Sequence, residues 1–457
     1  MKFPVTAPGK GTVAVLCACL VGLLCAAKPA ATEPGTDQYF SGNAFYNKKL
    51  YKLAIKEYAD FMRRHPQHSK HENARYGLAL SHFALGDFAN AERCLREVVS
   101  RGKVGNKDHL NLLRGQCFLK MKNRLEAEKV FKSVVGSTKN PKFKAGAIAG
   151  LTEMLFQQKK WKETAPQADE LLKIDANSGY TQLVLYQSAF ACRELGDLKR
   201  ATGYLETLGR QVVKEPLKSR SAYLLAECYR QTGQMAKAAT QYTRASRGLD
   251  GQIGAEVMYR LGFVNFAQEK YDAAIEALQK AVNADLKGYL GDEAKFYLAR
   301  SLYEKGENGK ARYLLEGLSK SNSKLAPRAA LWLARAAGAQ NKHSDAAGVL
   351  RDAAQRFKKD GVAADLYFEQ GNALVAEGKY KEAADAFGQV LRWEKWPQRN
   401  DALRLYAICL HRAGDFQNSL KRADEFMQKY KDDKELAQVR FLKAENQGSA
   451  IEIGNDV

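Results

Sequence analysis

Three histidines in the stretch HPQHSKHE have the spacing of a candidate metal site. His65, His68 and His71 stand three residues apart, and short histidine-rich tracts are a compositional signal of metal binding. Against this interpretation, the stretch falls between two helical patterns, and Ser69 with Glu72 has the spacing of a capping box that starts a helix. The remaining histidines are isolated along the chain. We therefore favour a solvated loop and predict no metal site.

Two glycine-containing stretches match nucleotide-binding loops only in part. GNALVAEGKY, residues 371–380, has the wrong glycine spacing for a phosphate loop, and tyrosine follows its lysine where serine or threonine is needed. GLDGQIG, residues 248–254, lacks the preceding strand that a dinucleotide fingerprint requires. No HExxH, GxSxG or paired-carboxylate pattern stands out in the sequence. The sequence therefore predicts no cofactor and no catalytic residue.

One pattern, seen in AEGKYKEAADAF, recurs along most of the chain and must position whatever chemistry the protein has. One small residue of this pattern, the anchor, returns eleven times at spacings of 35 to 37 residues. The anchors are Ala54, Ala91, Ala127, Thr164, Ala201, Ala238, Ala274, Ala311, Ala346, Ala383 and Ser419. A pattern used so often predicts a structural module and not a unique catalytic centre.

A second small residue, the first small residue of each unit, stands twelve positions before the anchor. These residues are Gly42, Ala79, Gly115, Thr152, Ala189, Ala226, Gly262, Ala299, Ala334, Gly371 and Ala407. Apolar residues between the two places follow helical spacing, and turns such as LGD and AEGK separate them. We predict hairpins of two helices that touch at the small residues, where a larger side chain would cost about 1 to 3 kcal/mol.

This combination resembles the tetratricopeptide repeat. An aromatic residue near the start of the second helix, the anchor three residues later and a bulky residue four beyond carry the resemblance, as in Tyr380, Ala383 and Phe387. It implies an all-α fold, an α/α superhelical solenoid of about eleven helix-hairpin repeats over residues 37–435. The period exceeds the usual 34 residues of that family, which places the extra residues in the second helix or the connection between repeats.

Two parts of the array depart from the regular repeat. The fourth repeat has Thr152 and Thr164 at its small positions, and Pro166 predicts a second helix that starts late or bends, because proline fits only the first turn of a helix. At the C-terminal end, we expect residues 436–446 to form a capping helix and residues 447–457 to form a loose tail.

The first 27 residues have the features of an export signal. Lys2 and Lys10 precede an apolar run, Val13–Ala27, that is shorter than the roughly 20 residues of a membrane span. We predict that residues 1–27 are a cleaved signal peptide or, alternatively, an N-terminal anchor, followed by a short linker, residues 28–36. The run LCAC matches a lipoprotein signal only in part. The absence of glycosylation sequons favours a bacterial periplasm or envelope.

Five cysteines lie beyond that segment. They are Cys94, Cys117, Cys192, Cys228 and Cys409. An odd number without CxxC spacing indicates neither a disulfide framework nor a zinc site. We expect buried thiols, while pairing of Cys94 with Cys117, or of Cys192 with Cys228, stays open because sequence does not define the geometry.

The net charge of +21 is spread unevenly along the chain. Residues 28–140 carry +10, whereas residues 361–457 carry −2. Such a field attracts anionic surfaces or acidic partners and does not determine the fold. One function class that follows is a binder of anionic polymer, such as cell-wall or surface glycan, through the basic N-terminal repeats. Nucleic acid is a weaker candidate, because the leader and the variable period count against it.

The resemblance implies a superhelix whose first helices line a concave groove. Residues three before and four after the first small residue would face that groove, and aromatic and arginine residues alternate there in repeats five to nine. Tyrosine and arginine dominate binding hot spots. The predicted partner-binding residues are Tyr186, Arg193, Tyr223, Arg230, Tyr259, Phe266, Phe296, Arg300 and Tyr303. The alternative is that the aromatic residues are simply helix packing.

These features together predict a non-catalytic scaffold for protein–protein interaction in the cell envelope. The expected partner is a protein that presents an acidic or extended peptide segment, because arginine binds carboxylates with two parallel hydrogen bonds. Membrane contact is expected only through the N-terminus, if the leader is retained. An enzyme is the least supported class, because repeats occupy essentially the whole chain.

Overall fold

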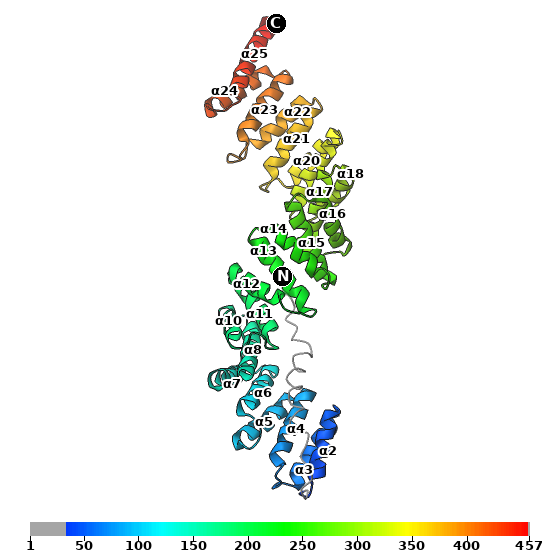
Figure 1. The fold of residues 1–457 in the computed structure, drawn as a ribbon. Helices are drawn as coiled ribbons and strands as arrows, with labels where there is room; N and C mark the ends of the chain where they lie inside the picture. The colour runs from blue at the N-terminus through cyan, green and yellow to red at the C-terminus, as the bar shows by residue number, and fades with distance from the viewer. Residues whose placement is uncertain (1–32, 456–457) are drawn as a thin grey trace. The chain divides into compact units, whose positions relative to one another are not determined.

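The computed structural model describes residues 33–455, with side chains described as far as residue 448. The predicted signal or anchor segment and most of the predicted linker lie outside the described residues. Between residues 33 and 455 the chain is helical throughout and contains no strand, as predicted. Two compact units, one ending at Thr232 and the other beginning at Gly233, are each stacks of consecutive helices (Figure 1).

Unit 1 contains the first five repeats and the first helix of the sixth. Its first helices are α2 (Thr36–Asn47), α4 (His71–Leu85), α6 (Lys107–Lys120), α8 (Pro141–Gln157), α11 (Thr181–Glu194) and α13 (Leu217–Gln231). Its second helices are α3 (Tyr51–Arg64), α5 (Phe88–Arg101), α7 (Arg124–Ser137), the pair α9 (Trp161–Thr164) and α10 (Gln167–Asp175), and α12 (Leu198–Gly209).

Unit 2 contains the rest of the array. Its first helices are α15 (Gly251–Ala267), α17 (Gly288–Glu304), α19 (Ala326–Gly338), α21 (Ala363–Ala376) and α23 (Arg399–Arg412). Its second helices are α14 (Met235–Ala245), α16 (Tyr271–Asn283), α18 (Asn308–Lys320), α20 (His343–Arg356), α22 (Tyr380–Val390) and α24 (Phe416–Lys429), and α25 (Leu436–Asn455) follows them.

The small residues lie where the two helices of a hairpin touch. A Cβ atom added to Gly115 would lie 2.6 Å from a ring carbon of Phe131, and one added to Gly371 would lie 2.6 Å from the ring of Phe387. Both rings are fully buried. Because these distances are shorter than any tolerable carbon contact, glycine lets the second helix approach closely. The close contact that the spacing predicts is therefore present.

The turn inside each hairpin explains the recurring LGD and AGD sequences. The glycine adopts a left-handed backbone, with φ of 83° at Gly86 and 80° at Gly414, a conformation that costs glycine little. The aspartate that follows caps the second helix, because the Asp87 and Asp415 carboxylates accept hydrogen bonds from backbone N–H groups three residues on. The turn thus ends one helix and starts the next within three residues.

The second helix of the fourth repeat is interrupted, in agreement with the prediction from Pro166. The short helix α9 ends at Thr164, and α10 begins at Gln167. Proline has no N–H to donate and its ring clashes with the preceding turn, so it stands at the start of α10 and not within a continuous helix.

The C-terminal helix is longer than expected. α25 begins at Leu436, where the capping helix was predicted, but continues to Asn455 through most of the segment predicted to be a loose tail. The segment has no proline to block a helix, and its two glycines weaken it only by about 1 kcal/mol each. None of the helices within residues 33–455 combines the length and apolar character of a membrane span.

Candidate partner-binding surface

Several pairs of first helices from adjacent repeats contact one another within each unit. In unit 1, α2 contacts α4 and α6 contacts α8, and in unit 2, α15 contacts α17 and α19 contacts α21. Within the described chain, no comparable set of contacts joins the second helices of adjacent repeats. In each unit taken by itself, we call the surface formed by the first helices the first-helix face; these helices are α2, α4, α6, α8, α11 and α13 in unit 1 and α15, α17, α19, α21 and α23 in unit 2.

The earlier of the two predicted groove positions, three residues before the first small residue, is buried. Its predicted partner-binding residues, all between 1% and 9% exposed, are Tyr186, Tyr223, Tyr259 and Phe296. The Tyr259 hydroxyl donates to Glu293 Oε2 at 2.7 Å and so joins α15 to α17, and burial raises its pKa. These four side chains pack between helices, which corrects their prediction as partner-contacting residues.

The later position, four residues after the first small residue, holds half-buried arginines in repeats five and six of unit 1. Arg193 lies 4.9 Å from the Phe190 ring centroid and forms an ion pair with Glu194. One repeat further, Arg230 pairs with Glu227 at 3.0 Å. Both arginines therefore reach the first-helix face, but each has an acidic neighbour that satisfies its charge.

Unit 2 presents an arginine held between two aromatic rings. The Arg300 guanidinium carbon lies 4.7 Å from the ring centroid of Phe266 and 4.3 Å from that of Trp332. Tyr303 meets Trp332 edge to face at 5.4 Å, and Arg335 lies 4.9 Å from the same ring. We call these five residues the Arg300 cluster. It draws on α15, α17 and α19 and brings together three residues that the sequence predicted: Phe266, Arg300 and Tyr303.

Arg300 differs from Arg335 and Arg260 in its lack of an ion-pair partner. Arg335 pairs with Glu369 at 2.7 Å, and Arg260 pairs with Glu256 at 3.6 Å. In the described part of the chain, Arg300 forms no ion pair, and its Nε is buried without a hydrogen-bond partner. Burial lowers the pKa of this guanidinium. The two rings stabilise its charge by cation–π contact but leave its buried Nε without an acceptor.

A recess of about 390 Å³ adjoins this cluster. It is lined by Glu269, Lys270, Tyr271, Asp272, Ala273 and Lys305. The Tyr271 ring lies 5.9 Å from the Phe266 ring, so the recess continues the first-helix face toward the hairpin turn of the seventh repeat. Lys305 pairs with Asp272 across it at 3.1 Å.

Sequence reasoning missed Trp332. It stands two residues before the first small residue, a place outside the two positions that were read as the groove. One feature of the sequence could have identified Trp332: Arg335 follows three residues later, on the same side of the helix. The contact of Trp332 with Arg300 joins neighbouring repeats, however, and a repeat-by-repeat alignment does not reveal it.

The histidine stretch does not assemble a metal site. His68 Nε2 lies 3.1 Å from Thr36 Oγ1, and its Nδ1 accepts a hydrogen bond from the Lys70 amide at 2.9 Å. Ser69 donates through its amide and its hydroxyl to the Glu33 carboxylate. The predicted capping box is therefore wrong, because Ser69 binds Glu33, just before α2, and does not cap α4.

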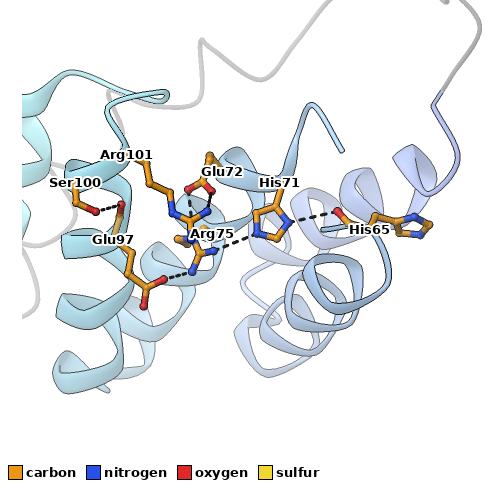
Figure 2. Close-up of polar contacts among 7 residues, drawn as sticks. All are labelled: His65, His71, Glu72, Arg75, Glu97, Ser100 and Arg101. Carbon is orange, nitrogen blue, oxygen red and sulfur yellow. Dashed lines mark hydrogen bonds and ion pairs between the residues drawn. The ribbon is translucent and has the colours of Figure 1, made fainter. Parts of the chain in front are cut away.

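Figure 2 shows that His71 belongs to an ion-pair network between α4 and α5. Arg75 contacts His71 Nε2 at 3.1 Å and forms ion pairs with Glu72 and Glu97. Glu72 also pairs with Arg101 at 2.8 Å. Among the residues that the structure describes, no group of ligands that could hold a metal ion is present. The network joins helices within the second repeat.

All five cysteines of the described chain are buried free thiols. Burial raises the pKa of each of them, to about 12 at Cys117 and Cys409. The two pairings that the sequence left open are not formed. Buried neutral thiols of this kind are unreactive, because the thiolate is the nucleophile.

Comparison with known protein families agrees with this architecture. A tetratricopeptide repeat model matches residues 76–141, 259–321, 296–361 and 368–428, together slightly more than half of the chain. The chain belongs to the tetratricopeptide repeat family. A second family model, anaphase-promoting complex, cyclosome, subunit 3, matches residues 194–281 of this tetratricopeptide repeat protein. No curated protein matches the sequence.

Several solved structures resemble the array at low sequence identity. A tetratricopeptide repeat protein from Parabacteroides merdae is 14% identical, with 59% of this chain and 98% of that chain covered and a TM-score of 0.38. The C-terminal part of a repeat protein from Cytophaga hutchinsonii is 17% identical, with 64% and 98% covered and a TM-score of 0.40. The APC/C hetero-tetramer Cut9-Hcn1 is 13% identical, with 91% and 96% covered and a TM-score of 0.35.

Proposed function

We propose that this tetratricopeptide repeat protein is a non-catalytic scaffold that holds extended segments of partner proteins on its first-helix face. Tetratricopeptide repeats generally mediate protein–protein interaction. The observation that carries the proposal is the half-buried row of aromatic and arginine side chains on α15, α17 and α19, since these residue types dominate binding hot spots. The match of residues 194–281 to a subunit of a multiprotein complex supports the same kind of role.

We place the scaffold in the envelope of a bacterium. Two lysines, a short apolar run and small residues at its end support export of the chain through residues 1–27. Expression of the complete chain in a bacterium, followed by cell fractionation and N-terminal sequencing, tests this part. We expect the protein in the periplasm with Lys28 as its first residue. Recovery from the cytoplasm with Met1 intact would contradict the assignment.

The binding function is tested by affinity capture from an envelope extract. The chain beginning at Lys28 is immobilised, washed at low and at high salt, and the retained molecules are identified by mass spectrometry. A discrete protein retained at high salt is expected, because apolar and hydrogen-bonded contacts survive screening better than long-range attraction. Retention of only salt-labile glycan or nucleic acid would favour the alternative function, binding of anionic polymer through the basic residues 28–140.

A further inference from the structure

The Arg300 cluster has the features of a site for one negatively charged group. Arg300 is held between the Phe266 and Trp332 rings, and its position is therefore fixed before any ligand arrives. Fixing a side chain in advance reduces the entropy lost on binding. Its Nε has no acceptor in the described chain but is buried, so the terminal N–H groups are the donors that a ligand would reach. A planar guanidinium with free donors matches the geometry of a carboxylate.

The surroundings argue for an isolated carboxylate and against a continuous polyanion. Glu304 lies one turn further along α17 and is exposed. Glu369 on α21 forms an ion pair with Arg335 on α19. On the other side, Glu269 and Asp272 line the adjoining recess. These acids would repel a glycan sulfate chain or a nucleic acid backbone, which carries a charge at every unit. A peptide with one acidic side chain flanked by apolar residues meets no such repulsion.

The aromatic residues around Arg300 supply the apolar part of the contact. Tyr303 and Trp332 form an edge-to-face pair beside the guanidinium, and Tyr271 opens onto the recess next to Phe266. An extended peptide places alternate side chains on the same side. One acidic side chain on Arg300 would therefore bring the residue two positions away over this aromatic surface or toward the recess.

We propose that Arg300 is the docking point for an internal Asp or Glu side chain of an extended partner segment, with Phe266, Tyr303 and Trp332 packing against its neighbouring apolar residues. This inference rests on the proposed scaffold function and names the partner chemistry of the same surface. It concerns side-chain carboxylates, so the partner's C-terminus is not required.

The test uses two fluorescein-labelled, C-terminally amidated decapeptide libraries and the chain beginning at Lys28. The acidic library has Asp or Glu at one central position and Tyr, Leu or Gly at every other position, and the amide library has Asn or Gln at that central position. Fluorescence anisotropy is expected to show binding of the acidic library at least about tenfold tighter than that of the amide library. A tenfold change corresponds to about 1.4 kcal/mol, within the range of a charged hydrogen bond.

Arg300→Gln is expected to reduce affinity for the acidic library to that for the amide library. The matched control is Arg351→Gln, which removes one positive charge from the same unit at an exposed ion pair on α20 and should leave binding unchanged. Arg300→Lys keeps the charge but loses the planar fork, and we expect an intermediate affinity. Circular dichroism and thermal melting check that each variant is folded.

Equal binding of the two libraries, or equal binding by Arg300→Gln and Arg351→Gln, would overturn the inference. Tighter binding of a single-stranded DNA decamer that depends on Arg300 would replace the peptide with a polyanion. If Arg300→Gln still captures the same envelope protein as the unchanged chain, the scaffold function stands and only the role of Arg300 is wrong. If the unchanged chain binds acidic peptides but captures no protein, the scaffold function is the part that fails.

Discussion

Replacement of Tyr259 by alanine separates a packing role from a binding role. Tyr259 is 2% exposed, and its hydroxyl donates to Glu293 across α15 and α17. A buried tyrosine removes about 150 to 200 Å² from water, which contributes about 4 to 5 kcal/mol. Aromatic-to-alanine changes in protein cores cost about 3 to 5 kcal/mol, and we expect a loss in this range.

The matched control is Tyr313→Ala on α18 of the same unit. Tyr313 is 81% exposed, and exposed substitutions usually change the free energy of unfolding by no more than about 0.5 kcal/mol. With an m value of about 3 kcal/mol/M, urea denaturation should lower the midpoint of unit 2 by about 1 to 1.7 M for Tyr259→Ala. Tyr313→Ala should leave that midpoint nearly unchanged.

Unfolding of a repeat array can be local, because each repeat contacts only its neighbours. Hydrogen exchange with mass spectrometry therefore accompanies the urea titration, and the loss of protection for Tyr259→Ala should begin in α15 and α17. A Tyr259→Ala protein with unchanged midpoint and unchanged exchange, but with lost partner capture, would refute the packing role. It would return Tyr259 to the binding surface that the sequence predicted.

Three further predictions follow from packing and burial. Gly371→Ala should destabilise the protein by about 1 to 3 kcal/mol, because its Cβ would clash with the buried Phe387 ring. Gly317 lies in open space within α18, and Gly317→Ala should stabilise the protein by about 0.5 to 1 kcal/mol. Thermal melting of both variants checks these two changes. Burial raises the thiol pKa values in the folded state only. The contribution of the thiols to the free energy of unfolding should therefore be fully present below pH 8.5, the thiol pKa in the unfolded state, and should fall as pH rises above it. Urea titrations from pH 7 to pH 10 measure this change. At pH 8 the folded chain beginning at Lys28 should not react with a thiol reagent, and the unfolded chain should react at the buried residues Cys94, Cys117, Cys192, Cys228 and Cys409.

The architecture could be predicted from sequence because it depends on residue size at fixed spacing. Gly371 and Phe387 stand sixteen residues apart in the same relation as Gly115 and Phe131, and both pairs touch in the structure. The interruption at Pro166 also follows from local chemistry, since proline cannot donate to a helix. Each of these features depends on residues within a single repeat. An alignment of the repeats with one another compares single repeats, and it therefore detects such features.

The extent to which each side chain is buried could not be predicted in the same way. Tyr259 and Phe266 lie seven residues apart on the same side of α15, yet Tyr259 is buried and Phe266 is half-exposed. The difference arises from the neighbouring repeat, because α17 supplies Glu293 as a partner for Tyr259 and places Arg300 over Phe266. Helical periodicity shows which residues share a face, but contacts between repeats decide how deeply each one is covered.

The net charge of +21 is also a poor guide to where a partner binds. On the first-helix face, Arg193, Arg230 and Arg335 each have a carboxylate within ion-pair distance, so little of their charge is available to a ligand. Arg300 has no carboxylate within ion-pair distance in the described chain, and two aromatic rings lie against its guanidinium, while Glu304 acts on its charge only from a longer distance. In the proposed site, recognition of a discrete acidic residue depends on the unpaired Arg300 guanidinium and its fixed position. A uniformly positive surface would attract many polyanions without distinguishing among them, and the ion pairs of Arg193, Arg230 and Arg335 remove three arginines that would otherwise compete with Arg300 for the ligand.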